Sequence, residues 1–538
     1  MGFLAPPART LAALAAALTL ATAAPALAQD VGGNAVWLGQ LGDLNVLDIT
    51  QTGRDNKAGA DYLFLLLGQN GVGNKLTLDQ YGHDNALGTL FVDMPRFARG
   101  VWQRGDLNVI DITQRNTGPT GANIFGSVQQ SSALRLPTDA TSFNTLTAIQ
   151  TSLGDATGYG GHYIGRVVQA ATGDAGSAGN TAFIVQRGGG ENAGNTLANL
   201  RQVGSGNSFG TIQSGEGNRI GEEPRLAGLP IGGIVQLGAD NRGWLVQDGA
   251  QNLIEYLQQY GDANAARVRL SGNRNAISQI YQNNESWRGA ALGNRVSISV
   301  SGDDNGGDGT GWVGELIRSP SLAVPGIAHA VFLQIGDDND MSLAVLSGEE
   351  TKYGMTQIGD GNIAHVAIAG TLPGATARAN ETAVFQDGDT NYVSHTVSGS
   401  NNTGAFREEG NRNVIVATQT GSFNTARVAI AGDGNNSGLS SLFGEAATLL
   451  GTVPGMTLER GHLVQEGLGA SALEANSIDL DVIGASNAFT VYQSGSGNLA
   501  DGTVTGSGNA LAIVQQHRGN TAHGQQAGAG NSLGIHQF

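Results

Sequence analysis

Short segments of alternating apolar and polar residues recur along the chain. After Asn45, the sequence VLDIT places Leu47 and Ile49 on one face and Asp and Thr on the other. The segments VIDIT before Gln114 and TARVA before Ile430 alternate in the same way. A period of two in β-branched residues is typical of a strand with one buried face, whereas a helix needs apolar residues three and four positions apart. The pattern therefore predicts many short strands and an all-β fold.

The predicted strands are separated by a Gln-x-Gly-x-x-Asn motif, which gives a repeating unit of 11 residues. Gly accepts positive φ without steric penalty, and Asn tolerates it better than most residues, so Gly-x-x-Asn predicts a tight turn. Two units, about 22 residues, form one strand-turn-strand coil, and stacked coils place strand on strand at about 4.8 Å. The sequence therefore predicts an amyloid-like β-solenoid, with an upper limit of about 23 coils for about 500 residues.

The Gln and Asn of each unit have the same parity as the inward apolar residues. In a stacked coil each amide would lie above an identical amide and could hydrogen-bond along the axis. A buried amide without a partner costs about 1–3 kcal/mol, so the stack gives a physical reason for the fixed spacing. Outward positions such as Thr490 are expected to lack this constraint. The predicted ladder and turn residues are Gln40, Gly42, Asn45, Gln51, Gln202, Asn207, Gln213, Gln386, Gly388, Asn391, Gln419, Asn424, Gln493, Gly495, Asn498, Gln515, Gln526, Asn531 and Gln537.

Composition supports a repeat structure over ordinary globular domains. The 538 residues include 84 Gly, only 14% are charged and 6% are aromatic. The net charge of −17 argues against nucleic acid as a partner, because phosphate backbones need Lys and Arg clusters. The chain has no Cys, which excludes disulfides, thiolate metal sites and a Cys nucleophile.

The first 28 residues have the features of a cleaved Sec signal peptide. Arg9 precedes a long apolar run that ends at Ala26-Leu27-Ala28, which fits the small-x-small cleavage rule. Gln29 is then the first residue of the mature chain. No later run approaches 18 apolar residues, so no membrane-spanning helix is expected.

At the Gln-x-Gly-x-x-Asn motifs the chain resembles the curlin repeat of curli fimbriae. The segments QSGSGNLADGTV and QQAGAGNSLGIHQ match the family pattern most closely. The resemblance implies an amyloid-like fibre subunit that serves cell adhesion and biofilm matrix on the surface of a Gram-negative bacterium. It also implies self-association and, as partners, other curlin-type subunits and the curli secretion machinery. The resemblance covers most of residues 31–85, 202–282, 330–436 and 482–538.

The interpretation divides the chain into a signal peptide, 1–28, and a repeat solenoid, 29–538, with four insertions. His162 lies in one insertion, and Glu445, Glu459 and His462 lie in another, but no catalytic motif surrounds them. Asp303-Asp304 and Asp337-Asp338 are interpreted as solvated turn carboxylates rather than a calcium site. We therefore expect no enzyme activity, no metal and no cofactor. The insertions are expected near 89–101, 152–179, 306–328 and 437–463.

Two other functions remain open alternatives. One is a monomeric surface adhesin with a solenoid stalk. The other is a β-helix enzyme acting on polysaccharides, although such clefts use Lys and the chain has only Lys57, Lys75 and Lys352. For a fibre protein, the C-terminal coils are the expected self-association edge, because Val482 to Phe538 carries few charges and no Pro. Whether the chain is main subunit, nucleator or cap stays open.

Overall fold

The structure is a computed structural model. It describes residues 34–36, 38–53, 55–59, 67–82, 85–87, 101–105, 107–115, 123–132, 144–151, 161–171, 178–188, 194–221, 233–284, 292–307, 312–313, 327–370, 376–437, 459–467 and 471–538.

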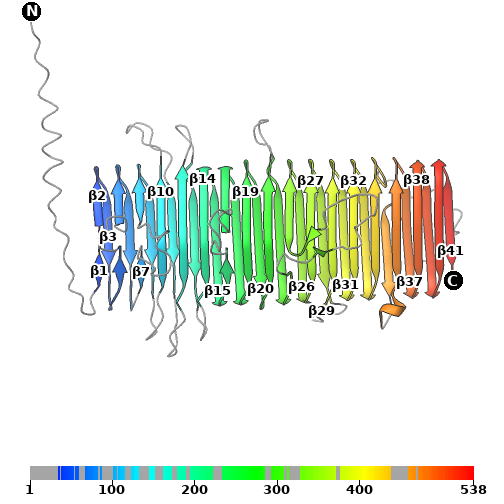
Figure 1. The fold of residues 1–538 in the computed structure, drawn as a ribbon, viewed down its shortest axis with the longest axis horizontal. Helices are drawn as coiled ribbons and strands as arrows, with labels where there is room; N and C mark the ends of the chain where they lie inside the picture. Colours follow the sequence, from blue (N-terminus) through cyan, green and yellow to red (C-terminus); the bar gives the residue numbers. More distant parts are fainter. Residues whose placement is uncertain are drawn as a thin grey trace, which may run out of the picture.

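Two long parallel sheets face each other along the whole described chain, with strands roughly perpendicular to the long axis (Figure 1). The chain alternates between the sheets, so each strand pairs in parallel with the strand one coil before and one coil after it. This is the all-β solenoid that the alternating pattern predicts. Where the repeat is regular, the Gln-x-Gly-x-x-Asn motif spans the crossing from one sheet to the other, as in the step from Gln493 to Asn498.

The first sheet contains 21 strands. They are β1 (Ala35–Val36), β2 (Leu38–Leu41), β4 (Lys57–Ala58), β5 (Leu67–Asn70), β7 (Ala86–Leu87), β8 (Trp102–Arg104), β10 (Ile124–Ser131), β12 (Tyr163–Ala171), β14 (Thr196–Ser205), β16 (Arg219–Ile220), β17 (Gly233–Ala239), β19 (Leu253–Tyr260), β21 (Ala276–Asn283), β25 (Val331–Ile335), β27 (Lys352–Ile358), β30 (Glu381–Asp387), β32 (Thr403–Glu409), β34 (Thr425–Ala431), β36 (Ser477–Ile483), β38 (Leu499–Ser507) and β40 (Thr521–Ala529).

The second sheet runs from β3 to β41. Its strands are β3 (Val46–Thr50), β6 (Lys75–Asp79), β9 (Val109–Thr113), β11 (Thr145–Ile149), β13 (Thr181–Gln186), β15 (Ser208–Glu216), β18 (Arg242–Ala250), β20 (Ala265–Ser271), β22 (Arg295–Asp303), β26 (Asp340–Glu349), β28 (Ile363–Ala369), β29 (Ala377–Arg378), β31 (Tyr392–Ser400), β33 (Val414–Ser422), β35 (His462–Gly467), β37 (Ala488–Ser496), β39 (Ala510–Arg518) and β41 (Ser532–Gln537).

Strands that belong to one coil are sometimes interrupted. β16 and β17 belong to one coil and both pair with β14. β14 is continuous, whereas its partner strand is interrupted between β16 and β17. With such pairs counted once, the described residues form seventeen coils, which at about 4.8 Å per coil span about 80 Å. This lies below the upper limit from chain length, because the chain also contains residues between the strands.

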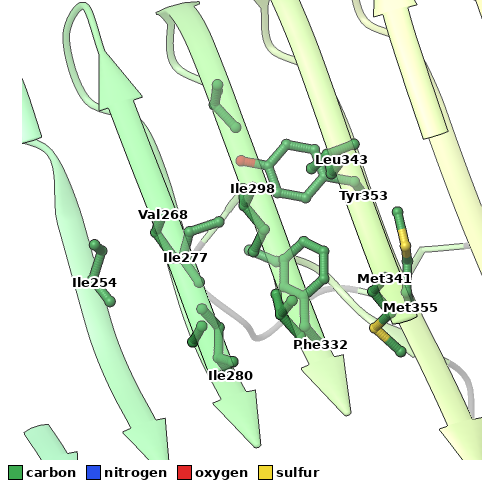
Figure 2. Close-up of a cluster of buried hydrophobic side chains, with 14 of the residues drawn as sticks. Ile254, Val268, Ile277, Ile280, Ile298, Phe332, Met341, Leu343, Tyr353 and Met355 are labelled. Carbon is green, nitrogen blue, oxygen red and sulfur yellow. The ribbon is translucent and has the colours of Figure 1, made fainter. Parts of the chain in front are cut away.

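Apolar side chains from both sheets form one continuous core from Ala58 to Ala522. Figure 2 shows a part of it, where the aromatic rings of Phe332 and Tyr353 replace the usual Ile, Leu and Val. Their ring centroids lie 5.9 Å apart, and the buried Tyr353 hydroxyl donates a hydrogen bond to the Ala276 carbonyl at 3.3 Å. The core predicted from the alternating segments therefore also accommodates aromatic rings. The hydroxyl of Tyr353 is tolerated there because a backbone carbonyl accepts its hydrogen bond.

The four ranges expected to be insertions are partly described. Within 152–179, β12 is a regular solenoid strand that pairs with β10 and β14. Within 306–328, the short strands β23 (Trp312–Val313) and β24 (Ile327–Ala328) pair antiparallel and lie against β27 and β30. β35 begins at His462, so the end of 437–463 also belongs to the second sheet. Most of the remaining residues of these ranges, with all of 1–28 and Glu445, lie outside the described residues.

The described residues contain one short 3-10 helix, η3 (Ala472–Glu474). No helix among them is long and apolar enough to cross a membrane.

Candidate functional site

The Gln side chains of the first sheet form a continuous hydrogen-bonded column inside the solenoid. Each Nε2 donates to the Oε1 of the Gln in the next coil, as from Gln202 to Gln236 at 2.8 Å. The second N–H of Gln202 donates to backbone carbonyls, including that of Thr181 at 2.9 Å. We call this the first glutamine column. Its members in order are Gln40, Gln69, Gln103, Gln130, Gln169, Gln202, Gln236, Gln259, Gln282, Gln334, Gln357 and Gln386.

This column ends on a carboxyl group. Gln386 donates to Glu408 Oε2 at 2.9 Å, and Glu408 is fully buried. Burial raises the pKa of Glu408 well above its ordinary value, although the hydrogen bond from Gln386 opposes this. The next position is Ile430, and Glu408 Oε1 has no hydrogen-bond partner among the described residues. The column position is apolar at Val482 and Val504 and returns to Gln at Gln526.

The second sheet holds a second glutamine column, which is divided by apolar residues. Two runs of five Gln lie near the two ends of the solenoid, and Gln213 and Gln247 form a shorter run. Between Gln247 and the last run, the column positions are Leu270, Val300, Val345, Ile368 and Val397. The two long runs are Gln51, Gln80, Gln114, Gln150 and Gln186, then Gln419, Gln465, Gln493, Gln515 and Gln537.

The first run of this column is reversed. Gln186 donates toward the N-terminal coils, to Gln150 at 2.8 Å, whereas Gln213 donates to Gln247 at 2.9 Å. Gln186 and Gln213 are neighbours in the ladder, and neither Oε1 has a hydrogen-bond partner within the described chain. Rotating the five amides from Gln51 to Gln186 by 180° would align the run with its neighbour and pair these oxygens.

A buried histidine begins the last run. The ring of His395 lies two residues before Val397, and its Nε2 is 3.0 Å from Gln419 Oε1. The apolar Val397 offers Gln419 no donor, and His395 supplies one. Gly404 on β32 makes room for the ring, since a Cβ there would lie 2.3 Å from His395 Cε1. Burial lowers the pKa of His395 to about 4, against the effect of its hydrogen bond to Gln419.

Two asparagine columns follow the turns at the two edges of the solenoid. In the first, each Asn Oδ1 accepts the backbone N–H of the Asn one coil later, as from Asn264 to Asn241 at 3.1 Å. The side-chain Nδ2 of Asn264 donates to the same oxygen at 3.0 Å. This first asparagine column is unbroken through all seventeen coils, from Asn45 to Asn531.

The second asparagine column runs from Asn34 to Asn520 and contains two other residues. Thr351 occupies one position, and His162 occupies another. Nδ1 of His162 accepts the backbone N–H of Asn195 at 3.1 Å, as an Asn Oδ1 would. Burial lowers the pKa of His162 to about 4, although a backbone hydrogen bond to Thr151 opposes this. His162 therefore occupies a structural position in the repeat.

The predicted ladder and turn residues are distributed over these columns. Gln40, Gln202, Gln386 and Gln526 lie in the first glutamine column, and Gln51, Gln213, Gln419, Gln493, Gln515 and Gln537 lie in the second. Asn45, Asn207, Asn391 and Asn531 lie in the first asparagine column, and Asn424 and Asn498 lie in the second.

The predicted turn glycines, Gly42, Gly388 and Gly495, all have positive φ. At Gly42, with φ 108°, a Cβ would lie 2.1 Å from the Gly71 carbonyl oxygen of the next coil. The stacked turns are therefore too close for any side chain at this position, in addition to the backbone requirement.

A further column was missed from the sequence. The residue after several turn glycines is Asp or Asn, and its side chain accepts the backbone N–H of its counterpart one coil earlier. Asp360 Oδ1 accepts from Asp337 N at 2.8 Å, and Asp389 Oδ1 accepts from Asp360 N at 2.8 Å. The recurrence of Gly-Asp and Gly-Asn in the motif is the signal that could have identified it.

The remaining chemical candidates have structural partners. Asp303 accepts the backbone N–H of Asn273 at 2.7 Å, and Asp304 pairs with Arg274 at 2.6 Å. Glu459 and His462 form a partly exposed pair at 3.0 Å. Across the described ranges, no three His, Asp or Glu side chains gather in a way that could hold a metal ion.

Both ends of the described solenoid present partly exposed core residues. Leu47 and Ile49 of β3 lie at one end, and Leu533 and Ile535 of β41 lie at the other, each packed on the core from one side. Within the described residues, β41 pairs with β39 alone and β3 pairs with β6 alone. Among the described residues no strand covers the outer edges of β3 and β41, which are edges of the kind to which a further strand can add.

No protein-family model matches this chain. A search of curated proteins gives no significant match.

Proposed function

We propose that this chain is a structural protein that assembles end to end into extracellular fibres. The observation that carries the proposal is the match between its two ends. Each is an open parallel edge with half-buried core residues, and edges of this kind template the addition of another strand. A second copy is the partner that fits both edges at once.

The residues of the two ends have the same order and spacing. If β3 of one copy adds to β41 of another, Leu47 meets Leu533 and Ile49 meets Ile535. The same register places β2 on β40, so that Gln40 continues the column of Gln526. The asparagine column continues in step, with Asn45 beside Asn531. One docking geometry therefore extends both sheets, the core and the columns together.

The amide directions in the first sheet also agree. Gln40 donates toward Gln69, which leaves its Oε1 directed out of the N-terminal end. Gln526 donates one N–H to the Ala510 carbonyl at 2.9 Å, and its other N–H is free to meet Gln40 of the next copy. In the second sheet, Gln51 and Gln537 would both present N–H groups, because the run from Gln51 is reversed. Docking in this register favours rotation of that run.

The biological setting follows from the resemblance to curlin repeats. We place the chain on the surface of a Gram-negative bacterium, after Sec export and passage through a curli-type secretion system. There it acts as main subunit or nucleator of curli-like amyloid fibres, together with other curlin-type subunits, in adhesion and biofilm matrix. The alternative is a surface adhesin that keeps the same solenoid as a monomeric stalk.

The experiment compares two substitutions on β41 in the chain starting at Gln29. Ile535→Asp places a charge on the inward face of the end, and Ser532→Asp places the same charge on the outward face of the same strand. Burying an unpaired carboxylate is unfavourable, so we expect Ile535→Asp to slow seeded elongation by about tenfold or more. Ser532→Asp should elongate at close to the parental rate.

Elongation is followed by fluorescence of an amyloid dye and by electron microscopy. Leu47→Asp, at the opposite end, should give the same defect as Ile535→Asp, because end-to-end docking uses both faces. A parental chain that stays monomeric with seeds present would support the adhesin instead. Equal rates for Ile535→Asp and Ser532→Asp would rule out docking through this face.

A further inference from the structure

The outer face of the second sheet carries a groove lined by an indole ring and arginines. Its volume is about 460 Å³, and the residues lining it include Trp244, Arg242, Arg267, Arg295 and Asp340, from β18, β20, β22 and β26. We call it the arginine groove. It lies on one side of the solenoid, away from the two ends that the proposed function uses.

The Trp244 ring occupies the space left by a glycine beside it. Trp244 pairs in register with Gly210 on β15, where a Cβ would lie 2.2 Å from two ring carbons. Any larger residue at Gly210 would displace the ring. Phe183 pairs with Gly210 from the other side, so the two aromatic side chains lie in one row, two coils or about 10 Å apart. Trp244 is 38% exposed and Phe183 is 39% exposed.

The arginines repeat along the same axis. Arg242 and Arg295 occupy one row with Ala265 between them, again about 10 Å apart, and Arg267 is next to Trp244 in register. Arg295 lies 3.5 Å from Asp338, whereas Arg242 and Arg267 form no ion pair with any described residue. In a chain with 28 basic and 45 acidic residues, this concentration of exposed guanidinium groups is unusual.

We propose that the arginine groove binds a linear acidic polysaccharide that carries carboxylate groups. The guanidinium fork matches a carboxylate in bidentate geometry. A flat, half-exposed indole offers an apolar surface to the C–H face of a sugar ring. Within each row, equivalent side chains stand two coils or about 10 Å apart. This distance matches the length of a disaccharide in an extended chain, so successive disaccharides can meet equivalent side chains.

The surroundings favour a polymer with hydroxyl groups between its charges over a phosphate backbone. Asp340 lines the groove, and Asp338 lies at its edge beside Arg295. These carboxylates accept hydrogen bonds from sugar hydroxyls, whereas the phosphate groups of a nucleic acid backbone have no hydrogen to donate to them. The net charge of −17 repels any polyanion, so the hydroxyl groups that reach these carboxylates distinguish the two kinds of polymer. A polymer with hydroxyls between its charges fits this groove better than DNA or RNA.

The test uses the full chain before it polymerises, so that its outcome is independent of fibre formation. Binding of oligogalacturonate is measured by calorimetry at low ionic strength, with a neutral cello-oligosaccharide and oligo-dT of similar length as comparisons. Arg267→Gln and Trp244→Ala should each weaken binding by about tenfold, the size expected for one charged hydrogen bond or one aromatic contact. Arg219→Gln, an exposed arginine on β16 of the first sheet, should change affinity by less than about twofold.

Three results would overturn the proposal. The parental chain could fail to bind oligogalacturonate, oligo-dT could bind as tightly, or Arg267→Gln and Trp244→Ala could bind as well as Arg219→Gln. Circular dichroism of each variant verifies that the outward substitutions leave the solenoid folded. Weaker binding of the neutral oligosaccharide than of oligogalacturonate is the supporting result.

Discussion

At the scale of single residues, two buried titratable groups stand where the glutamine columns change. His395 begins the last run of the second column, and Glu408 ends the long run of the first. Both have pKa values shifted by burial toward the neutral form. A neutral His donates to Gln419, and a protonated Glu avoids a buried charge, so the two groups give opposite pH dependences of stability.

We expect acid to destabilise the coils around His395. Its pKa is about 4 in the folded chain and 6.5 when unperturbed, so the unfolded chain binds a proton between these values and the folded chain does not. This contribution to stability is intact above pH 6.5 and is lost as the pH falls toward 4. The loss at pH 4.5 is about 2–3 kcal/mol. Urea unfolding at pH 7.5 and 4.5 measures it.

His395→Gln should remove the part of the acid loss that comes from His395, since the amide can still donate to Gln419, while the buried His162 keeps its own part. His523→Gln, at an exposed site, is the control, and its stability should depend on pH as that of the parental chain does. If His395→Gln loses as much stability in acid as the parental chain, His395 is not the group responsible.

Glu408 should act in the other direction. Its unfolded pKa is near 4.5 and its folded pKa is raised, so its contribution to stability falls as the pH rises above 4.5. Glu408→Gln should therefore raise the urea midpoint at pH 7.5 and have little effect at pH 4. A Gln can end a run without penalty: Gln247, followed by Leu270, donates to the carbonyls of Arg219 and Asn252. A lower midpoint at pH 7.5 would contradict this expectation.

At the scale of elements, the two kinds of column differ in how far they tolerate substitution. Apolar residues replace Gln at eight positions, and in each case the ladder simply begins again farther along. The first asparagine column has no replacement, because each Asn accepts a backbone N–H that the turn leaves unpaired. The Asn therefore completes the main chain of the turn, whereas the Gln links one core layer to the next.

Asn498 lies in the second asparagine column, where its Oδ1 likewise accepts a backbone N–H, so we expect Asn498→Leu to destabilise the array more than Gln493→Leu. The first change leaves the Asn520 backbone N–H without its acceptor, at about 1–3 kcal/mol for an unpaired group, and removes the side-chain donor to Asn476 Oδ1, which keeps only the backbone N–H of residue 498. The second breaks two ladder bonds at a position that is apolar elsewhere. Local hydrogen exchange around β37 and β39 is the measurement, with the exposed Thr505→Leu as control. Equal effects of the Asn and Gln variants would contradict the distinction.

The turns explain which elements could be predicted from the sequence. Strands with 11-residue spacing, such as those around Gln493 and Gln515, were predictable because strand and turn both keep their length. β12 was hidden, because extra residues separate Gln169 from Asn180 and disturb the spacing while the strand still pairs. Thr490 faces outward as expected, yet it is buried, with its hydroxyl donating to the His462 carbonyl at 2.9 Å. Contacts that arise outside the repeat leave no periodic signal.

At the scale of the whole molecule, the solenoid was predictable from periodicity, but the predicted coil of about 22 residues holds only in regular coils such as Gln493 to Gln515, whereas Gln282 and Gln334 are 52 residues apart. The arginine groove was not predictable, because its residues come from five strands of unequal spacing and meet only through the sheet register. The same holds for His395 and Gly404, whose fit depends on packing between the two sheets. The repeat determines where each strand lies, and the exceptions to the repeat distinguish one coil from another.

The direction of the backbone hydrogen bonds has a mechanical consequence. Because the strands lie across the long axis, tension applied along that axis loads the coil-to-coil interfaces in series, and the weakest interface limits the strength. The early coils are joined in the first sheet by interrupted ladders, two residues from β1 to β4 and four from β2 to β5, whereas β38 and β40 pair over nine residues without a break. A filament pulled lengthwise should therefore tear near the N-terminal coils of each subunit. Tension across the axis would instead be shared by many strands at once.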